Sequence, residues 1–146
     1  MYRWIASAIV AILFGGTFQA QAQFSIRAAS TDSVPGWERM ELGNQAVWVA
    51  PAASLTSADI GRAEPITTPD NKRAVAIEFT DAGAEKMRKL STAQIDKLIA
   101  MVLDGNLLWA PRVRSEMGKQ AVLTGNGPNG LSDAVVQRIL ASVRQR

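Results

Sequence analysis

The stretch LIAMVLDGNLLWAPRV, residues 98–113, decides the fold. Two apolar runs, residues 98–103 and 107–113, flank the sequence Asp104-Gly105-Asn106. An Asp-Gly pair between apolar runs favours a β-hairpin, because a type I′ turn needs positive φ angles at both of its central residues. We therefore predict an antiparallel hairpin that turns at Asp104, Gly105 and Asn106. Pro111 has no backbone N–H, so it makes the second strand an edge strand or ends its pairing early.

The segments on either side of this hairpin show strand and helix patterns in turn. Residues 74–79 place alternate apolar side chains on one face of a strand, and Thr80 can cap a helix over residues 81–90. Residues 131–144 carry the apolar stripe of an amphipathic helix. The remaining predicted elements are strands at 24–28, 46–49 and 120–123, a short helix at 55–60, and a loop at 64–72 that contains Pro65 and Pro69.

The predicted order of elements is β-β-α-β-α-β-β-β-α. Strands joined by tight turns pair antiparallel, and amphipathic helices cover one face of the sheet that they form. The predicted fold class is therefore α+β, a two-layer sandwich of a mostly antiparallel sheet with two or three helices on one face. Within it, we expect residues 23–54 to form N-terminal strands and a connector, and residues 55–146 to form the α+β domain.

The first 22 residues have the pattern of a secretory signal peptide. Arg3 precedes an apolar or small stretch at residues 4–14, and the small residues Ala20 and Ala22 occupy the positions that a signal peptidase recognises. An uncleaved membrane anchor is the alternative, but a spanning helix needs about 20 apolar residues and this run is shorter. We expect cleavage after Ala22 and export to the periplasm or the extracellular space.

The composition excludes several classes of function. The chain has 146 residues, a formal net charge of +3, and neither cysteine nor histidine. The absence of cysteine excludes disulfides, zinc–thiolate sites and cysteine nucleophiles, and the absence of histidine removes the commonest general base and metal ligand. We therefore expect no enzymatic activity, no metal and no cofactor. Nucleic-acid binding is not expected either, because the basic residues are scattered and form no stripe.

Four segments carry motifs that occur together in one known family. The most specific is residues 100–113, where Asp104-Gly105 is followed by Ala110-Pro111. The others are VAIEFTDAGAEK at 75–86, LTSADIGRA at 55–63, and LTGN at 123–126 before the last helix. Together they resemble the head subdomain of the first periplasmic loop of SecD and SecDF protein translocase subunits. The resemblance implies a SecD-head-like domain over residues 55–146, outside the cytoplasmic membrane, that engages exported polypeptide.

The sequence also departs from that family. It contains none of the family's transmembrane helices, so we expect that this chain does not itself couple to a proton gradient. Trp109 stands where the family usually has a small residue, and residues 127–130 lengthen the turn before the last helix. The resemblance therefore implies the family's fold for this chain, but not the family's proton-driven motor function.

Two further motifs have both a catalytic and a structural interpretation. Residues 125–130 match G-x-G-x-x-G, but a dinucleotide site needs another parallel strand and an acidic residue about 20 positions on, so a strand-to-helix turn is favoured. Ser115 and Lys119 have the residue types of a Ser-Lys dyad, and Glu78 with Asp81 could bind a cation through oxygen. For these four residues, a loop and solvated charges are the favoured interpretations.

The hairpin strand offers the best candidate binding surface. Trp109 lies on the strand that Pro111 leaves as an edge, and an exposed edge accepts an extended peptide by strand addition. Packing of Trp109 against a helix is the alternative. We predict a partner-binding surface made of Leu107, Trp109, Pro111 and Arg112.

Three functions fit these patterns. The first is a non-enzymatic exported domain that binds polypeptide or an envelope protein, with the Sec translocon as a candidate partner. This domain would reach the membrane only through a partner or an uncleaved signal. The second is a secreted hydrolase with carboxylate or Ser-Lys chemistry, and the third is a structural module of an envelope assembly. The first is favoured, since the chain lacks histidine and cysteine, carries a signal pattern and resembles SecD heads.

Overall fold

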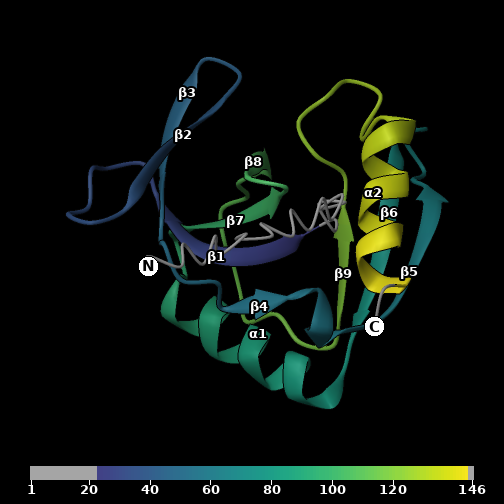
Figure 1. The fold of residues 1–146 in the computed structure, drawn as a ribbon, viewed down its shortest axis with the longest axis horizontal. Helices are drawn as coiled ribbons and strands as arrows, with labels where there is room; N and C mark the ends of the chain where they lie inside the picture. The colour runs from purple at the N-terminus through teal and green to yellow at the C-terminus, as the bar shows by residue number, and fades with distance from the viewer. Residues whose placement is uncertain (1–22, 145–146) are drawn as a thin grey trace, which may run out of the picture.

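The computed structural model describes residues 23–144 (Figure 1). The signal segment predicted at residues 1–22 lies outside the described residues. The strands are β1 Phe24–Ser30, β2 Glu38–Leu42, β3 Gln45–Val49, β4 Leu55–Thr56, β5 Ile60–Thr67, β6 Arg73–Phe79, β7 Leu98–Leu103, β8 Asn106–Trp109 and β9 Gln120–Leu123. The helices are the 3₁₀ turn η1 Ser57–Asp59 and the α-helices α1 Asp81–Ala93 and α2 Asp133–Arg144.

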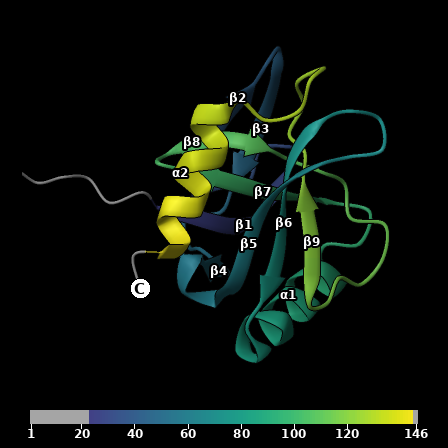
Figure 2. The same ribbon diagram turned by 90° about the vertical axis from the view of Figure 1, so that its right-hand side faces the viewer.

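The strands form two sheets with antiparallel ladders. One sheet has the order β2-β3-β1-β7-β8, with β4 also pairing β1, and the other has the order β5-β6-β9. Helix α1 lies at the bottom of the view in Figures 1 and 2. Helix α2 packs against β5. This architecture confirms the predicted α+β class. Within residues 23–144, no helix is long and apolar enough to cross a membrane.

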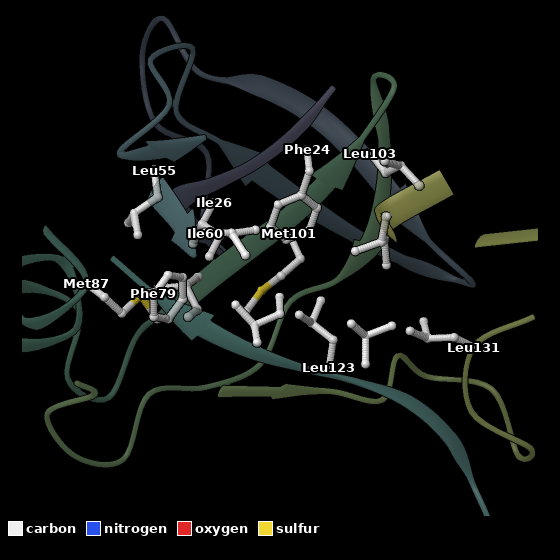
Figure 3. Close-up of a cluster of buried hydrophobic side chains, with 14 of the residues drawn as sticks. Phe24, Ile26, Leu55, Ile60, Phe79, Met87, Met101, Leu103, Leu123 and Leu131 are labelled. Carbon is white, nitrogen blue, oxygen red and sulfur yellow. The ribbon is translucent and has the colours of Figure 1, made fainter. Parts of the chain in front are cut away.

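The main core lies between the two sheets, and Figure 3 shows its side chains. Phe24 and Met101 enter it from the first sheet, Phe79 and Leu123 from the second, and Met87 closes it from α1. The opposite face of the first sheet has a smaller second core, which consists of Ala29, Val47, Val49, Leu98, Ala100 and Val102. Because both of its faces are covered, β7 is buried along its whole length, as its continuous apolar sequence requires.

The hairpin predicted at Asp104 is confirmed. Leu103 pairs with Asn106, and the two residues between them, Asp104 and Gly105, have φ angles of 51° and 81°. Both central residues therefore adopt the left-handed conformation that a type I′ turn requires.

The start of α1 packs closely against η1 at a contact that we call the Asp59 junction. Thr80 caps α1 as predicted, because its side-chain oxygen accepts the Gly83 N–H at 3.0 Å. The Asp59 carbonyl accepts the Thr80 N–H at 2.9 Å, and the buried Asp59 carboxylate accepts from the Thr56 N–H at 3.0 Å and the Lys86 ammonium at 2.9 Å. These five residues define the junction, which joins η1 to α1.

Two of the predicted elements in the first half of the chain are wrong. The helix predicted at residues 55–60 is the short strand β4 followed by η1, because Leu55 and Thr56 pair with β1. The loop predicted at residues 64–72 is in its first part the end of β5, which pairs with β6 through Pro65. Proline is tolerated there because β5 lies at the edge of its sheet.

Candidate functional site

An apolar groove opens between the two sheets, and we call it the Trp109 groove. It has a volume of about 220 Å³ and is lined on one side by β7, the end of β8 and the segment that follows, and on the other by β9. The lining residues are Ile99, Met101, Trp109, Pro111, Arg112, Val113, Arg114, Ser115, Met117, Ala121 and Val122.

The floor of this groove is part of the main core. Ile99, Met101 and Val113 are at most 3% exposed, and Trp109 is half-buried against the same core. At the side of the groove, Val122 on β9 is 46% exposed. The groove therefore leads from the buried main core to the exposed Val122 side chain on β9.

The rim of the groove is cationic. Arg112 and Arg114 are exposed, and Arg112 donates a hydrogen bond to the Asp96 carbonyl at 2.5 Å, which steadies its guanidinium group. Guanidinium groups form their strongest hydrogen bonds with carboxylates, and they also donate to backbone carbonyl oxygens. The groove thus combines an apolar floor with donors at its edge.

The wall beside β7 is a free strand edge. The first sheet ends at β8, and the chain after β8 continues along β7, since the Ile99 N–H donates to the Pro111 carbonyl at 3.1 Å and the Val113 N–H to the Lys97 carbonyl at 2.8 Å. Among the described residues, no further strand pairs with the outer side of this segment, although β2 packs against β8.

The wall formed by β9 is also a free edge. The second sheet ends at β9, and the Phe79 N–H donates to the Lys119 carbonyl at 2.8 Å, just before that strand. Because backbone polar groups alternate in direction along an antiparallel strand, Gln120 and Val122 direct their N–H and C=O groups away from β6. An extended peptide lying in the groove would therefore meet unpaired strand edges.

The structure brings together three of the four residues predicted as the partner-binding surface. The groove includes Trp109, Pro111 and Arg112. Leu107 lies elsewhere and packs against the second core. The pairing register gives the reason, because Leu107 pairs with Val102 of the second core whereas Trp109, after an irregularity in the ladder, pairs with Met101 of the main core.

Sequence reasoning missed the residues that the other wall contributes. Val122 and Met117 line the groove but were not predicted as site residues. A signal was present for Val122, because it shares the outward face of β9 with the polar Gln120. An apolar side chain on an otherwise polar strand face marks a surface with a use other than solvation.

The hairpin turn lies outside the groove, and its Asp104 side chain links the turn to the start of β1 and to α2. One Asp104 carboxylate oxygen accepts the Gln23 N–H at 2.9 Å, and the other accepts from the Arg138 guanidinium at 3.0 Å. The hydrogen bond from Gln23, together with the Arg138 charge, lowers the pKa of Asp104 below its usual value. Residues 23–144 hold no group of three acidic side chains arranged to bind a metal ion.

The glycine-rich motif at residues 125–130 forms a turn that packs closely on β6. Gly130 has a φ angle of 81°, and a Cβ atom at this position would lie 2.1 Å from the Arg73 carbonyl oxygen. The Leu131 N–H donates to that same carbonyl at 2.8 Å. Backbone packing between the turn and β6 therefore accounts for glycine at this position.

The charged groups considered for catalysis form solvent-facing ion pairs. Lys119 Nζ lies 3.7 Å from an Asp81 carboxylate oxygen and 3.9 Å from a Glu78 carboxylate oxygen. Because all three side chains are largely exposed, these contacts are typical of surface charge pairing. Ser115 lies at the rim of the Trp109 groove.

Comparison with known proteins places this geometry in a family. Residues 36–134 match the family described as SecDF, P1 head subdomain. Over 72 residues, or 49% of this chain, the sequence is 36% identical to the protein translocase subunit SecDF of Thermus thermophilus, and it spans 10% of that protein's length.

Two solved structures share the fold. A SecDF structure, described as a membrane component that enhances protein export, gives a TM-score of 0.63 at 22% identity and covers 85% of this chain and 62% of its own. A crystal structure of SecDF in a super-membrane-facing form gives a TM-score of 0.62 at 25% identity, over 85% of this chain and 19% of its own. The family match extends over most of the chain, so this protein belongs to the SecDF P1 head subdomain family.

Proposed function

We propose that this chain is a non-enzymatic, exported head domain that assists protein export by binding extended polypeptide in the Trp109 groove. The observation that carries the proposal is the position of the groove, an apolar floor between two free strand edges. Main-chain hydrogen bonds at a strand edge provide affinity for any sequence, and the apolar floor accepts side chains. Such a site suits a partner class that has many different sequences, as exported polypeptides do.

The size and charge of the groove set the kind of binding. Its volume of about 220 Å³ accommodates only a short segment of the partner, so the buried area is small, and small interfaces are typical of weak, transient binding. Arg112 and Arg114 on the rim are placed to donate to backbone carbonyls or acidic side chains of that segment. We therefore expect repeated short-lived binding of an unfolded chain.

The proposal includes export of the protein itself. The signal pattern of residues 1–22 supports secretion with cleavage after Ala22. The relative from Thermus thermophilus is named a protein translocase subunit, and this chain spans a tenth of its length. By extension, we expect this domain to work beside the Sec translocon, on the outer side of the cytoplasmic membrane.

A titration tests the binding proposal. The protein is exported, purified and titrated into a fluorescently labelled, permanently unfolded polypeptide, and binding is followed by fluorescence anisotropy. We expect Trp109→Ala to weaken binding about tenfold, since buried aromatic anchors dominate such interfaces. The matched control is Trp48→Ala, because Trp48 is also a half-buried tryptophan on a strand but lies outside the groove. Equal loss of binding in the two variants, or none in either, would contradict the proposal.

A further inference from the structure

The backbone of Gln23 is held by the hairpin turn through two hydrogen bonds. Its N–H donates to Asp104 Oδ1 at 2.9 Å, and its carbonyl accepts the Asp104 N–H at 2.9 Å. The adjacent pair Phe24 and Leu103 begins the ladder between β1 and β7. The Gln23 nitrogen therefore has a fixed position directly opposite a carboxylate.

The second oxygen of this carboxylate already has a cationic partner. Asp104 Oδ2 accepts from Arg138 Nε at 3.0 Å and from Arg138 Nη2 at 2.5 Å. The Asp104 side chain is 28% exposed, so water reaches it only in part. Each carboxylate oxygen thus has its own donor, with the Gln23 nitrogen on one side and the α2 guanidinium on the other.

We propose that Asp104 is a binding site for the α-amino group that forms when the chain is cut between Ala22 and Gln23. This inference rests on the export and cleavage included in the proposed function. In that cleavage, water adds across the peptide bond, so that Ala22 leaves with a carboxylate and Gln23 keeps an ammonium group. The Gln23 nitrogen already lies at hydrogen-bonding distance from Asp104, so the ammonium group forms an ion pair without any movement of the chain.

Cleavage converts a neutral hydrogen bond into a charge-assisted one. Hydrogen bonds between an ammonium group and a carboxylate are shorter and stronger than those between neutral groups. The processed chain is therefore more stable than an otherwise identical chain with a neutral nitrogen at Gln23. Removal of the signal thus strengthens the contact of the residue before β1 with the hairpin turn, which Arg138 in turn links to α2.

The ion pair gives the α-amino group a distinct pH behaviour. Its pKa rises above the usual value of about 7.7–8.0, because the carboxylate favours the ammonium form. The added stability is present below that usual value and is lost as the pH rises through the raised pKa of the folded state. The charged groups that face the amine are Asp104 from the hairpin and, across it, Arg138 from α2, which stays charged throughout this range.

The glutamine at residue 23 allows the charged amino terminus to be compared with an uncharged form of the same chain. An amino-terminal glutamine cyclises when its uncharged α-amine attacks the side-chain amide carbon, so that a C–N bond forms and ammonia leaves. The product, pyroglutamate, keeps an N–H at the same position but carries no charge. Because the ion-paired ammonium is not nucleophilic, we expect slow cyclisation in the folded wild type and faster cyclisation in Asp104→Asn.

The experiment compares four forms of the exported protein. These are the wild type and Asp104→Asn, each with a free Gln23 amine and each after cyclisation by glutaminyl cyclase in urea followed by refolding. Asparagine keeps the hairpin, since Asn-Gly also favours a type I′ turn. We expect cyclisation to lower the thermal midpoint of the wild type by about 3 °C at pH 7, and to leave that of Asp104→Asn unchanged.

Two measurements make the outcomes distinct. The intact mass of the exported protein reports the cleavage site, and the pH dependence of amine labelling at residue 23 reports the pKa of the α-amino group. A raised pKa in the wild type that returns to its usual value in Asp104→Asn supports the proposal. Equal thermal midpoints for the free and cyclised wild type overturn the proposal alone. Cleavage elsewhere overturns it together with the processing part of the proposed function, while the polypeptide titration reports groove binding independently.

Discussion

The Asp59 junction and the Trp109 groove differ in how closely their parts pack. At the junction, η1 and α1 approach until a Cβ atom added to Gly83 would lie 2.3 Å from the Asp59 carbonyl oxygen, and the Asp59 carboxylate is fully partnered. At the groove, Val122 remains exposed beside two free strand edges. The junction holds the fold, whereas the groove leaves apolar surface open for contact. Substitutions at the two places should therefore separate stability from binding.

The largest loss of stability is expected for Gly83→Ala. Alanine is normally the better residue inside a helix, by about 1 kcal/mol. Here its methyl group would overlap the Asp59 backbone, so we expect the free energy of unfolding to fall by about 3 kcal/mol in urea titrations. The matched control is Gly118→Ala, because a Cβ atom there has no neighbour within 4 Å. If Gly83→Ala left the free energy of unfolding unchanged, the junction would have room for a Cβ atom and would not be closely packed.

A smaller loss is expected when the carboxylate of the junction is removed. Asp59→Ala leaves the Thr56 N–H without its acceptor in a partly buried place, which should cost about 2 kcal/mol. Lys86→Met should cost less than Asp59→Ala, because the Lys86 side chain is half exposed and the Asp59 carboxylate keeps the Thr56 N–H as a donor. Chemical denaturation of both variants measures the difference. Equal costs would mean that the ion pair, and not the backbone hydrogen bond, carries the contribution of Asp59.

Strong local patterns predicted most of the fold. The hairpin at Asp104 follows from two apolar runs around a turn pair, and α1 from a capping residue before an amphipathic stretch. The structure of residues 55–67 was not predicted, because partners distant in the sequence decide it. Leu55 becomes a strand only by pairing with Ile26, and Pro65 is accepted in a strand only because β5 is an edge.

The candidate site was predictable on one wall only. Trp109, Pro111 and Arg112, which line the groove, were predicted as a surface because the hairpin and its proline define an edge within a continuous segment. The other wall required knowing that β9 ends the second sheet and faces the first across the groove, which no local periodicity encodes. Leu107 was predicted on the same surface as Trp109 because the two residues are two positions apart in one strand. A one-residue irregularity in the pairing, which the sequence does not reveal, places them on opposite faces of the sheet.

We expect low pH to remove the stability contributed by a weaker contact, the ion pair between Asp104 and Arg138. The pKa of Asp104 is lowered in the folded state, mainly by the Gln23 N–H and then by Arg138. Its contribution to stability is therefore present above about pH 3.9, the usual value for an unfolded aspartate, and is lost as the pH falls through the lower folded value. We expect Arg138→Gln to cost about 0.5 kcal/mol at pH 7, after screening by solvent, and almost nothing near pH 2. A constant cost at both pH values would assign the role of Arg138 to packing.

The smallest change in stability, with a large change in binding, is expected for Val122→Lys. Val122 is exposed, so the free energy of unfolding should change by less than about 0.5 kcal/mol. Lysine on a free edge opposes strand addition, and it also adds charge beside an apolar floor. Affinity for the unfolded polypeptide should therefore fall while the thermal midpoint stays unchanged, which is the reverse of the result expected for Gly83→Ala. If Val122→Lys bound the polypeptide as well as the wild type does, the β9 edge would have no part in the site, and binding would have to rest on the Trp109 wall alone.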